Sequence, residues 1–165
     1  MVGAVILSRD LRAFLDAART ATLATVDLRG RPRLVPVCFA LRPEDAGAAS
    51  PVLYTPLDAK PKTVSDVHEL ARARDIRVRP DVTLLVDRWD EDWSRLSWLR
   101  LHGRAELMEP GTVDADEHAA AIGLLRGRYP QYGAHALEAL PIIRIRIERA
   151  VAWNADQGAV LPNGR

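Results

Sequence analysis

The sequence predicts a mainly β protein, an antiparallel barrel of about six strands with peripheral helices, formed by one domain over residues 1–165. Three observations predict this class. Short apolar or alternating segments recur along the chain, Gly and Pro turn signals separate them, and most neighbours follow each other in hairpin order. A length of 165 residues suits a single domain with its own core.

Composition narrows the class of protein further. Hydrophobic residues make up 48% of the chain and charged residues 27%, as in an ordinary globular protein. The net charge of +1 gives no general attraction to nucleic acid or anionic lipid, and no apolar stretch is long enough to cross a bilayer. The single cysteine, Cys38, cannot form an internal disulfide. We therefore expect a cytoplasmic protein with neither nucleic-acid nor membrane partners.

The first elements are a helix and a hairpin. Ser8 can cap a helix that carries Leu11, Phe14, Leu15 and Ala18 on one face. The run ATLATV, the turn at residues 27–30 and a second run from Pro32 to Leu41 follow as two antiparallel strands. Because proline cannot donate to a sheet ladder, Pro36 marks an edge, a bulge or a place where the backbone faces a ligand.

The middle elements are two strands around a helix. Pro51–Thr55 predicts a third strand, and the spacing of Val64, Val67 and Ala71 predicts a helix from Thr63 to about Arg74. The run Val82–Val86 is almost entirely apolar, which predicts a strand covered on both faces.

The last elements alternate more clearly. Ser94–Met108 predicts the longest strand, with small or apolar residues at its odd positions. Asp114 opens an alanine-rich helix that runs to about Arg126. In the final strand, Ile143, Ile145 and Ile147 alternate with Arg144, Arg146 and Glu148, which predicts one buried and one exposed face.

The segment Lys60-Pro61-Lys62-Thr63 stands between a strand and the start of the predicted helix. Asp66 follows Thr63 at the spacing of a capping box. Free N–H groups, the positive end of a helix dipole and two ammonium groups then face one spot, which suits a phosphate. From spacing alone, a solvated surface turn is an equally acceptable interpretation.

Several other chemistries are poorly supported. The four histidines stand far apart without metal-ligand spacing, and the acids around residues 87–92 lack the oxygen spacing of a calcium loop. We therefore expect no metal site. GxSxG, GxGxxG and GxxxxGK are all absent, and Cys38 has no neighbouring base.

Two groups of side chains leave alternatives open. Arg72, Arg74, Arg77 and Arg79 suit an exposed helix end, or one or two of them extend the anion site. Trp89, Trp93 and Trp98 suit a core or a subunit contact, or a stacking surface for a flat ring. A phosphate site and aromatic residues together favour a planar phosphorylated cofactor.

Four stretches carry a resemblance to a known family: ATLATVDLRGRPRLVPVCFAL, VLYTPLDAKPKT, VTLLVDRWDEDWSRLSWLRLHGRAEL and PIIRIRI. In this order they resemble the flavin/deazaflavin oxidoreductases of the split-barrel group, related to pyridoxamine phosphate oxidase, and above all the actinobacterial branch that uses coenzyme F420. The stretches cover most of the chain, and their ordered combination is what makes the resemblance specific.

The resemblance implies a six-stranded split β-barrel that forms a homodimer, with two cofactor sites at the subunit interface. It implies that the cofactor phosphate is held by Lys60, Pro61, Lys62 and Thr63. The ring would lie along Leu34, Val35, Pro36, Val37, Tyr54 and Thr55. The partner subunit would contribute Trp93, Ser94 and Arg95.

The function implied is hydride transfer from reduced F420 to a small organic acceptor such as an enone or imine, with FMN as the alternative cofactor. No side chain is singled out as catalytic; Tyr54, Ser97 and ordered water are all open as the proton source. A non-catalytic carrier or sensor, with Trp98 as a lid over the ring, is an alternative from another class.

Overall fold

The computed structural model describes residues 5–44, 50–57, 66–155 and 161–163. The predicted phosphate anchor at residues 60–63 lies outside these ranges. The helices are α1 (Arg9–Ala17), α2 (Ala71–Val78) and α3 (Ala115–Arg128). The strands are β1 (Ala21–Val26), β2 (Pro32–Val37), β3 (Ala40–Leu41), β4 (Val52–Pro56), β5 (Asp81–Arg88), β6 (Ser97–Met108), β7 (Ile142–Asn154) and β8 (Leu161–Asn163).

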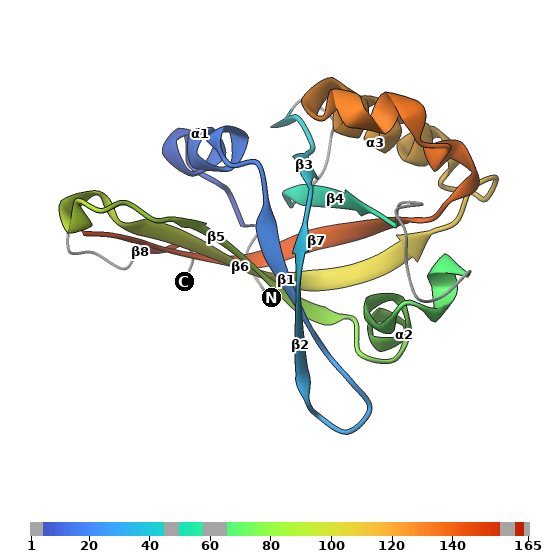
Figure 1. The fold of residues 1–165 in the computed structure, drawn as a ribbon, viewed down its shortest axis with the longest axis horizontal. Coiled ribbons are helices and arrows are strands. Elements are labelled where there is room, and N and C mark those ends of the chain that lie inside the picture. Colours follow the sequence, from blue (N-terminus) through green and yellow to red (C-terminus); the bar gives the residue numbers. More distant parts are fainter. Residues whose placement is uncertain (1–4, 45–49, 58–65, 156–160, 164–165) are drawn as a thin grey trace.

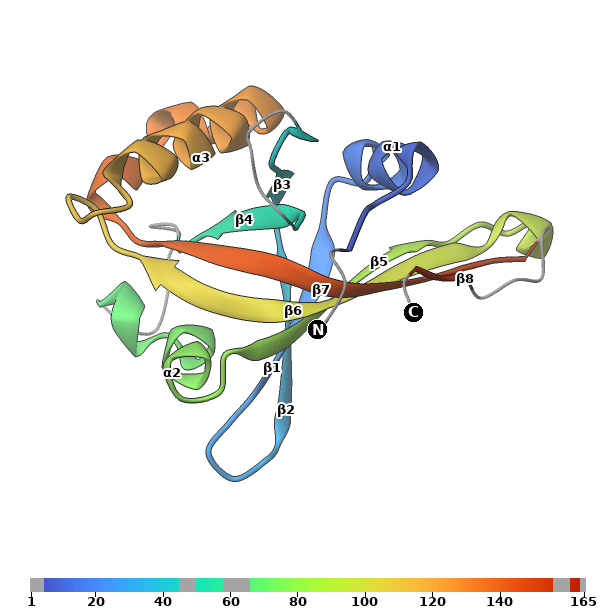
Figure 2. The same cartoon turned by 180° about the vertical axis from the view of Figure 1, so that it is seen from behind.

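All strand pairs are antiparallel and belong to one sheet in the order β2-β1-β5-β6-β7-β4-β3, with β8 added beside β7. β2 and β3 stand at opposite ends of this order, yet only residues 38 and 39 separate them in the chain. The sheet must therefore curl until its two ends meet. Figures 1 and 2 show this curled sheet, with α3 over one end of it and α2 beside the start of β5.

The chain bends between β2 and β3 because a side chain replaces the ladder there. The Phe39 N–H donates to the Tyr129 hydroxyl at 3.1 Å, and that hydroxyl lies 2.9 Å from the Phe39 carbonyl oxygen. Tyr129 follows α3 directly and is 5% exposed. Its hydroxyl satisfies backbone groups that an unbroken strand would pair with a neighbour, so the chain can leave β1 and join β4.

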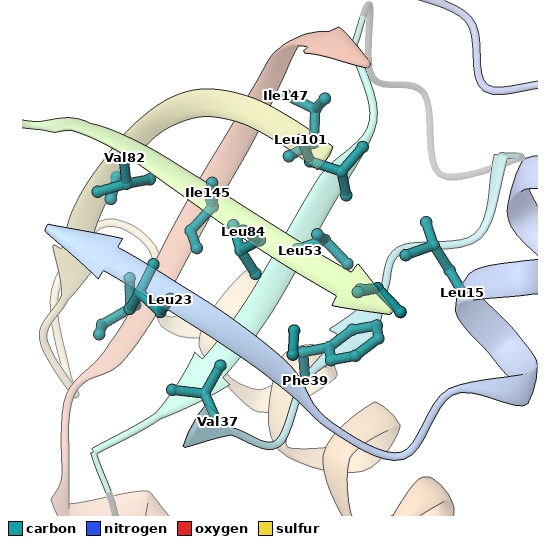
Figure 3. Close-up of a cluster of buried hydrophobic side chains, with 14 of the residues drawn as sticks. Leu15, Leu23, Val37, Phe39, Leu53, Val82, Leu84, Leu101, Ile145 and Ile147 are labelled. Atoms are coloured by element: carbon teal, nitrogen blue, oxygen red, sulfur yellow. The ribbon is translucent and has the colours of Figure 1, made fainter. Parts of the chain in front are cut away.

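Two hydrophobic clusters lie on either side of the sheet. The larger fills the inside of the curl, where side chains such as Leu23, Leu84 and Ile145 face one another (Figure 3). The smaller lies under α3 and includes Tyr54, Met108 and Leu125. Residue parity within one strand decides which cluster a side chain joins, since Leu53 belongs to the first and Tyr54 to the second.

Several predicted elements are confirmed. Ser8 caps α1 by accepting a hydrogen bond from the Leu11 N–H at 3.3 Å, and α3 follows Asp114. Pro36 lies on an edge strand, as its missing N–H requires. The described residues hold eight strands where six were expected, because the run from Pro32 to Leu41 divides into two and β8 carries no pattern that predicted it.

The helix predicted from Thr63 to Arg74 is wrong in its described part. Residues 67–69 form a 3₁₀ turn, Leu70 is extended, and α2 covers Ala71–Val78. The Asp66 carboxylate accepts from the His68 N–H at 2.8 Å and so caps the short turn, not an α-helix. The helix continues past Arg74 and ends before Pro80, which disfavours the α conformation at Arg79.

Three strand predictions also need correction. The segment β5 is covered on one face only, since Leu84 is 0% and Leu85 is 36% exposed. Ser94 and Arg95, predicted as the start of the longest strand, belong to a 3₁₀ turn over residues 93–95, and β6 begins at Ser97. Arg144 was expected on an exposed face but is 7% exposed, because α3 covers that end of the sheet.

Candidate functional site

The predicted ring contacts of β2 lie on a hairpin that projects from the barrel (Figure 1). Leu34 is 68% exposed, Pro36 is exposed, Val35 is half-buried, and Val37 points into the core with 7% exposure. β2 is the edge strand beside β1, so one side of its backbone is not paired within the described sheet. A free edge and adjacent apolar side chains form a surface that a flat molecule can contact.

Charged side chains hold this hairpin in place. The Asp27 carboxylate accepts hydrogen bonds from the backbone N–H groups of Arg29 and Arg31 at 2.8 and 2.9 Å. It also accepts from the Arg31 and Arg33 guanidiniums, at 2.8 and 3.3 Å. The backbone and side-chain hydrogen bonds of Arg31 lower the pKa of Asp27 to about 2. Its carboxylate therefore stays ionised and keeps the turn closed at neutral pH.

The exposed surface of the hairpin continues across β1 and β5. The register places Leu34 opposite Ala24, and Ala24 opposite Thr83. A second row joins Pro36, Thr22 and Leu85. These six side chains point away from the core cluster. We call the surface that they form the outer face; its residues are Leu34, Pro36, Thr22, Ala24, Thr83 and Leu85. The sequence pattern of β5 did not predict it, because an apolar run suggests burial on both sides.

Tyr54 and Thr55, also predicted as ring contacts, are each 1% exposed. The Tyr54 hydroxyl donates to a carboxylate oxygen of Glu117 at 2.7 Å, under α3. Burial, together with this hydrogen bond, raises the pKa of Tyr54 to about 12. A phenol that is buried, hydrogen-bonded and weakly acidic is poorly suited to donate a proton to a substrate. Tyr54 is therefore a poor candidate for the proton source.

The residues predicted to reach the partner's cofactor form the 3₁₀ turn between β5 and β6. Trp93 is 70% exposed, and Ser94 and Arg95 are exposed as well. The Asp92 carboxylate shapes the turn by accepting from the Ser94 N–H at 3.1 Å. Figure 1 shows this turn at the end of a ribbon that projects away from the barrel and from the β1–β2 hairpin.

Within one subunit, the structure does not bring the predicted site residues together. Leu34 and Pro36 lie on the outer face, Tyr54 and Thr55 are turned inward, and residues 93–95 stand on a separate hairpin. Lys60, Pro61, Lys62 and Thr63 lie outside the described residues. As cofactor contacts, all of these positions stay predictions, and a complete site would need a second copy.

Sequence reasoning missed a cluster just after the predicted anchor. His68 lies between two carboxylates: Nδ1 is 2.8 Å from Asp66 and Nε2 is 3.0 Å from Glu109. Hydrogen bonds to Glu109 and Asp66 raise the pKa of His68 above its ordinary value. Asp66 is two residues from His68 in the sequence, but Glu109 is 41 residues away. Because of this separation no local pattern indicates the cluster, and only the fold reveals it.

A family model described as pyridoxamine 5'-phosphate oxidase matches residues 7–154. This range is most of the sequence, so the chain belongs to the pyridoxamine 5'-phosphate oxidase family. The curled antiparallel sheet is consistent with the split barrel that the resemblance implied. The F420-specific branch is a finer assignment than this match.

Solved structures share the fold. A conserved hypothetical protein from Mycobacterium tuberculosis is 20% identical, with a TM-score of 0.67 and 94% of this chain and 90% of that chain covered. The heme storage protein HutZ from Vibrio cholerae is 18% identical (TM-score 0.63; 90% and 94% covered). An FAD-binding protein from Mesorhizobium loti is 19% identical (TM-score 0.59; 90% and 93% covered). No curated protein matches.

Two further observations concern expected absences. Across the described ranges, no helix combines the length and the apolar character needed to cross a membrane. Within the same ranges, no three His, Cys, Asp or Glu side chains gather in a way that could hold a metal ion.

Proposed function

We propose that the chain is a cytoplasmic F420-dependent oxidoreductase that acts as a homodimer and transfers a hydride between the deazaflavin and a small organic acceptor. Membership of the pyridoxamine 5'-phosphate oxidase family carries the proposal, since the match spans the predicted ring contacts and the predicted phosphate anchor. FMN is the alternative cofactor. The FAD-binding relative from Mesorhizobium loti supports a flavin-type ligand in general.

The described residues fit such a group. The outer face offers exposed apolar side chains, Leu34 and Pro36, beside the free backbone edge of β2. A tricyclic ring can pack on such side chains while its polar edge bonds backbone groups. Lys60 and Lys62 are the only lysines of the chain, and every other basic residue is arginine or histidine. Both compact ammonium groups thus fall at the predicted phosphate position.

The chain's own residues would bind the cofactor, orient its ring and shield it from water. Lys60 and Lys62 would hold the phosphate, β2 would set the plane of the ring, and the partner's turn at residues 93–95 would help to exclude water. When bound, the deazaflavin supplies the hydride-transfer chemistry. Because Tyr54 is buried against Glu117, the proton would come from Ser97 or water.

The first prediction concerns the phosphate anchor. We expect F420 to bind with micromolar or tighter affinity and FMN more weakly. The change Lys60→Ala/Lys62→Ala should cost about 1.5–3 kcal/mol of binding free energy per cation, since each makes a charge-assisted contact. Fluorescence titration with each cofactor measures the affinities. Arg9→Ala/Arg104→Ala removes two exposed cations that lie outside the predicted anion site and should leave the affinities unchanged.

Because the chain has only two lysines, the contact between these lysines and the cofactor phosphate can be measured without an activity assay. Reductive methylation with ¹³C-formaldehyde labels Lys60, Lys62 and the N-terminal amine, and both lysine signals should shift when F420 is added. Unshifted signals and an unchanged affinity of the double variant would refute the anchor. Tight binding without turnover of enone or imine acceptors would favour the carrier. Hemin is titrated in parallel, since HutZ is a heme storage protein.

The second prediction concerns the dimer. We place the outer face at the contact of the proposed homodimer, because the resemblance puts the ring contacts Leu34 and Pro36 at the subunit interface. Leu34→Glu/Leu85→Glu would then bury charges at that contact. We expect the dimer dissociation constant to rise about a hundredfold or more, because a two-fold interface repeats each substitution. Sedimentation equilibrium measures it. Val78→Glu/Val113→Glu changes two other exposed apolar residues and should leave the dimer intact; equal effects of the two variants would contradict the assignment of the outer face.

A further inference from the structure

We propose that each copy in the dimer docks an acidic hairpin tip on a basic patch of the other copy. The acidic tip comprises residues 87–95, and the basic patch comprises Arg100, His102 and Arg149. This inference rests on the homodimer of the proposed function and names a contact within it. It follows from the charges and the register of the sheet.

The basic patch continues the outer face onto β6 and β7. The register places Leu85 opposite Arg100, and Thr83 opposite His102. It then places His102 opposite Arg149 on β7. The named positions of the outer face are therefore uncharged on β2, β1 and β5, and the face becomes cationic on β6 and β7.

The charge of this patch is not neutralised within the described chain. Arg100 and Arg149 are both exposed, and among the described residues neither has an ion-pair partner. The Arg100 guanidinium lies over the Trp98 ring, 5.4 Å from its centroid. By contrast, Arg104 pairs with Asp81 at 3.3 Å, and Arg146 pairs with Glu106.

The pKa of His102 responds to the positive charges of the basic patch. The Nδ1 atom of His102 lies 3.0 Å from the Thr83 hydroxyl. Arg149 is opposite His102 in the register, and Arg100 precedes it by two residues on β6. Burial lowers the pKa of His102, and the charges of Arg100 and Arg149 lower it further. An uncompensated positive potential next to exposed apolar side chains favours an anionic partner surface that also carries apolar groups.

The acidic tip has this composition. It holds four carboxylates, at residues 87, 90, 91 and 92, against two arginines, at residues 88 and 95. Trp89 and Trp93 are 67% and 70% exposed, which is unusual for residues that large. Among aromatic side chains, tryptophan is the one most often found as an anchor in protein interfaces.

The carboxylates of the tip have two different tasks. Asp90 accepts from the Asp92 N–H at 2.9 Å, and Asp92 accepts from the Ser94 hydroxyl at 2.7 Å, so these two shape the turn. Asp87 and Glu91 are exposed, and within the described residues the carboxylate of neither has a hydrogen-bond or ion-pair partner. These two are therefore available to another surface.

The tip cannot fold back onto the patch of its own chain. The tip, Arg100 and His102 belong to the β5–β6 ribbon, in which Asp87 pairs with Trp98 and Arg88 with Ser97, and Arg149 lies on the next strand, β7. A paired ribbon of this kind holds its tip away from the middle of its own strands, as Figure 2 shows. In a two-fold dimer, however, tip and patch meet twice by symmetry.

Paired charge reversals test the contact. The tip variant is Asp87→Lys/Glu91→Lys, and the patch variant is Arg100→Glu/Arg149→Glu. Each alone should raise the dimer dissociation constant about tenfold or more, because both contacts of the dimer become repulsive. An equimolar mixture should form a heterodimer with wild-type affinity to within about threefold, since every contact then joins opposite charges. Native mass spectrometry identifies the heterodimer.

Controls separate this inference from the proposed dimer. Asp10→Lys/Asp116→Lys and Arg9→Glu/Arg79→Glu make the same charge changes at exposed positions in helices or directly after one, and should not alter dimerisation. In addition, the wild-type dissociation constant should rise with ionic strength between about 0.05 and 0.5 M salt. A salt-independent wild-type dimer, or a mixture that is no tighter than either variant, overturns the tip-to-patch contact alone. A wild-type monomer overturns the dimer as well.

Discussion

Replacing Gly103 by alanine is expected to destabilise the fold by about 3 kcal/mol. A Cβ at this position would lie 2.2 Å from the Arg146 carbonyl oxygen, an atom of the neighbouring strand's backbone. The pairing of β6 with β7 shifts register between His102 and Gly103, where Glu148 is the extra residue of β7. The bulge and the glycine together let the two longest strands bend around the core.

Chemical denaturation measures this effect, and Gly123→Ala is the matched control. Gly123 lies in α3 with open space around a new Cβ, so alanine there should stabilise the protein by about 0.5–1 kcal/mol through helix propensity. If Gly103→Ala were as stable as the wild type, the close approach of β6 and β7 described above would be wrong.

Replacing Arg144 by methionine is expected to lower the free energy of unfolding by about 3 kcal/mol. This value is at the lower end of the range for a broken buried ion pair, because the carboxylate partners of Arg144 are partly solvated. The Arg144 side chain is 8% exposed and donates to Glu106 at 3.0 Å, to Asp114 at 3.2 Å and to Glu117. It joins β6, β7 and α3. Its removal would leave three carboxylates close together without their shared cation.

Arg146→Met is the control for this change. Arg146 lies two residues further along the same strand and pairs with Glu106, but its side chain is 52% exposed. Its replacement should cost less than about 1 kcal/mol, as for other solvated ion pairs. Equal losses from the two variants would show that burial under α3 does not set the strength of the network.

The cost of Arg144→Met should also depend on pH. Hydrogen bonds from Arg144 lower the pKa of Glu106. Burial alone would raise the pKa of Glu117, but the hydrogen bonds from Tyr54 and Arg144 have the larger combined effect, so the pKa of Glu117 is lowered as well. Carboxyl groups with lowered pKa stabilise the folded state above their ordinary pKa of 4.5, and this contribution is lost as the pH falls through the lowered values. The difference between variant and wild type should therefore be largest at neutral pH and shrink in acid.

Much of the fold could be predicted because its signals are local. The Ser8 cap, the turn at residues 27–30 and the alternation of Ile143, Ile145 and Ile147 each depend on neighbours within a few positions. The candidate site was harder to predict, because its residues come from separate hairpins and, in the proposal, from two copies. Local pattern indicated only the anion site at residues 60–63, and family resemblance supplied the other positions.

The sequence by itself determined the class of protein, a mainly β chain with a hairpin order of strands, since periodicity and turn residues act over short distances. Only the tertiary structure decided that the run from Pro32 to Leu41 breaks at Phe39, that Arg144 and Tyr54 are buried under α3, and that Arg100 and Arg149 share one face with Leu34 and Leu85. The reason is physical: burial and register depend on which distant segment covers or pairs with a strand, and that partner is set by the closing of the whole sheet.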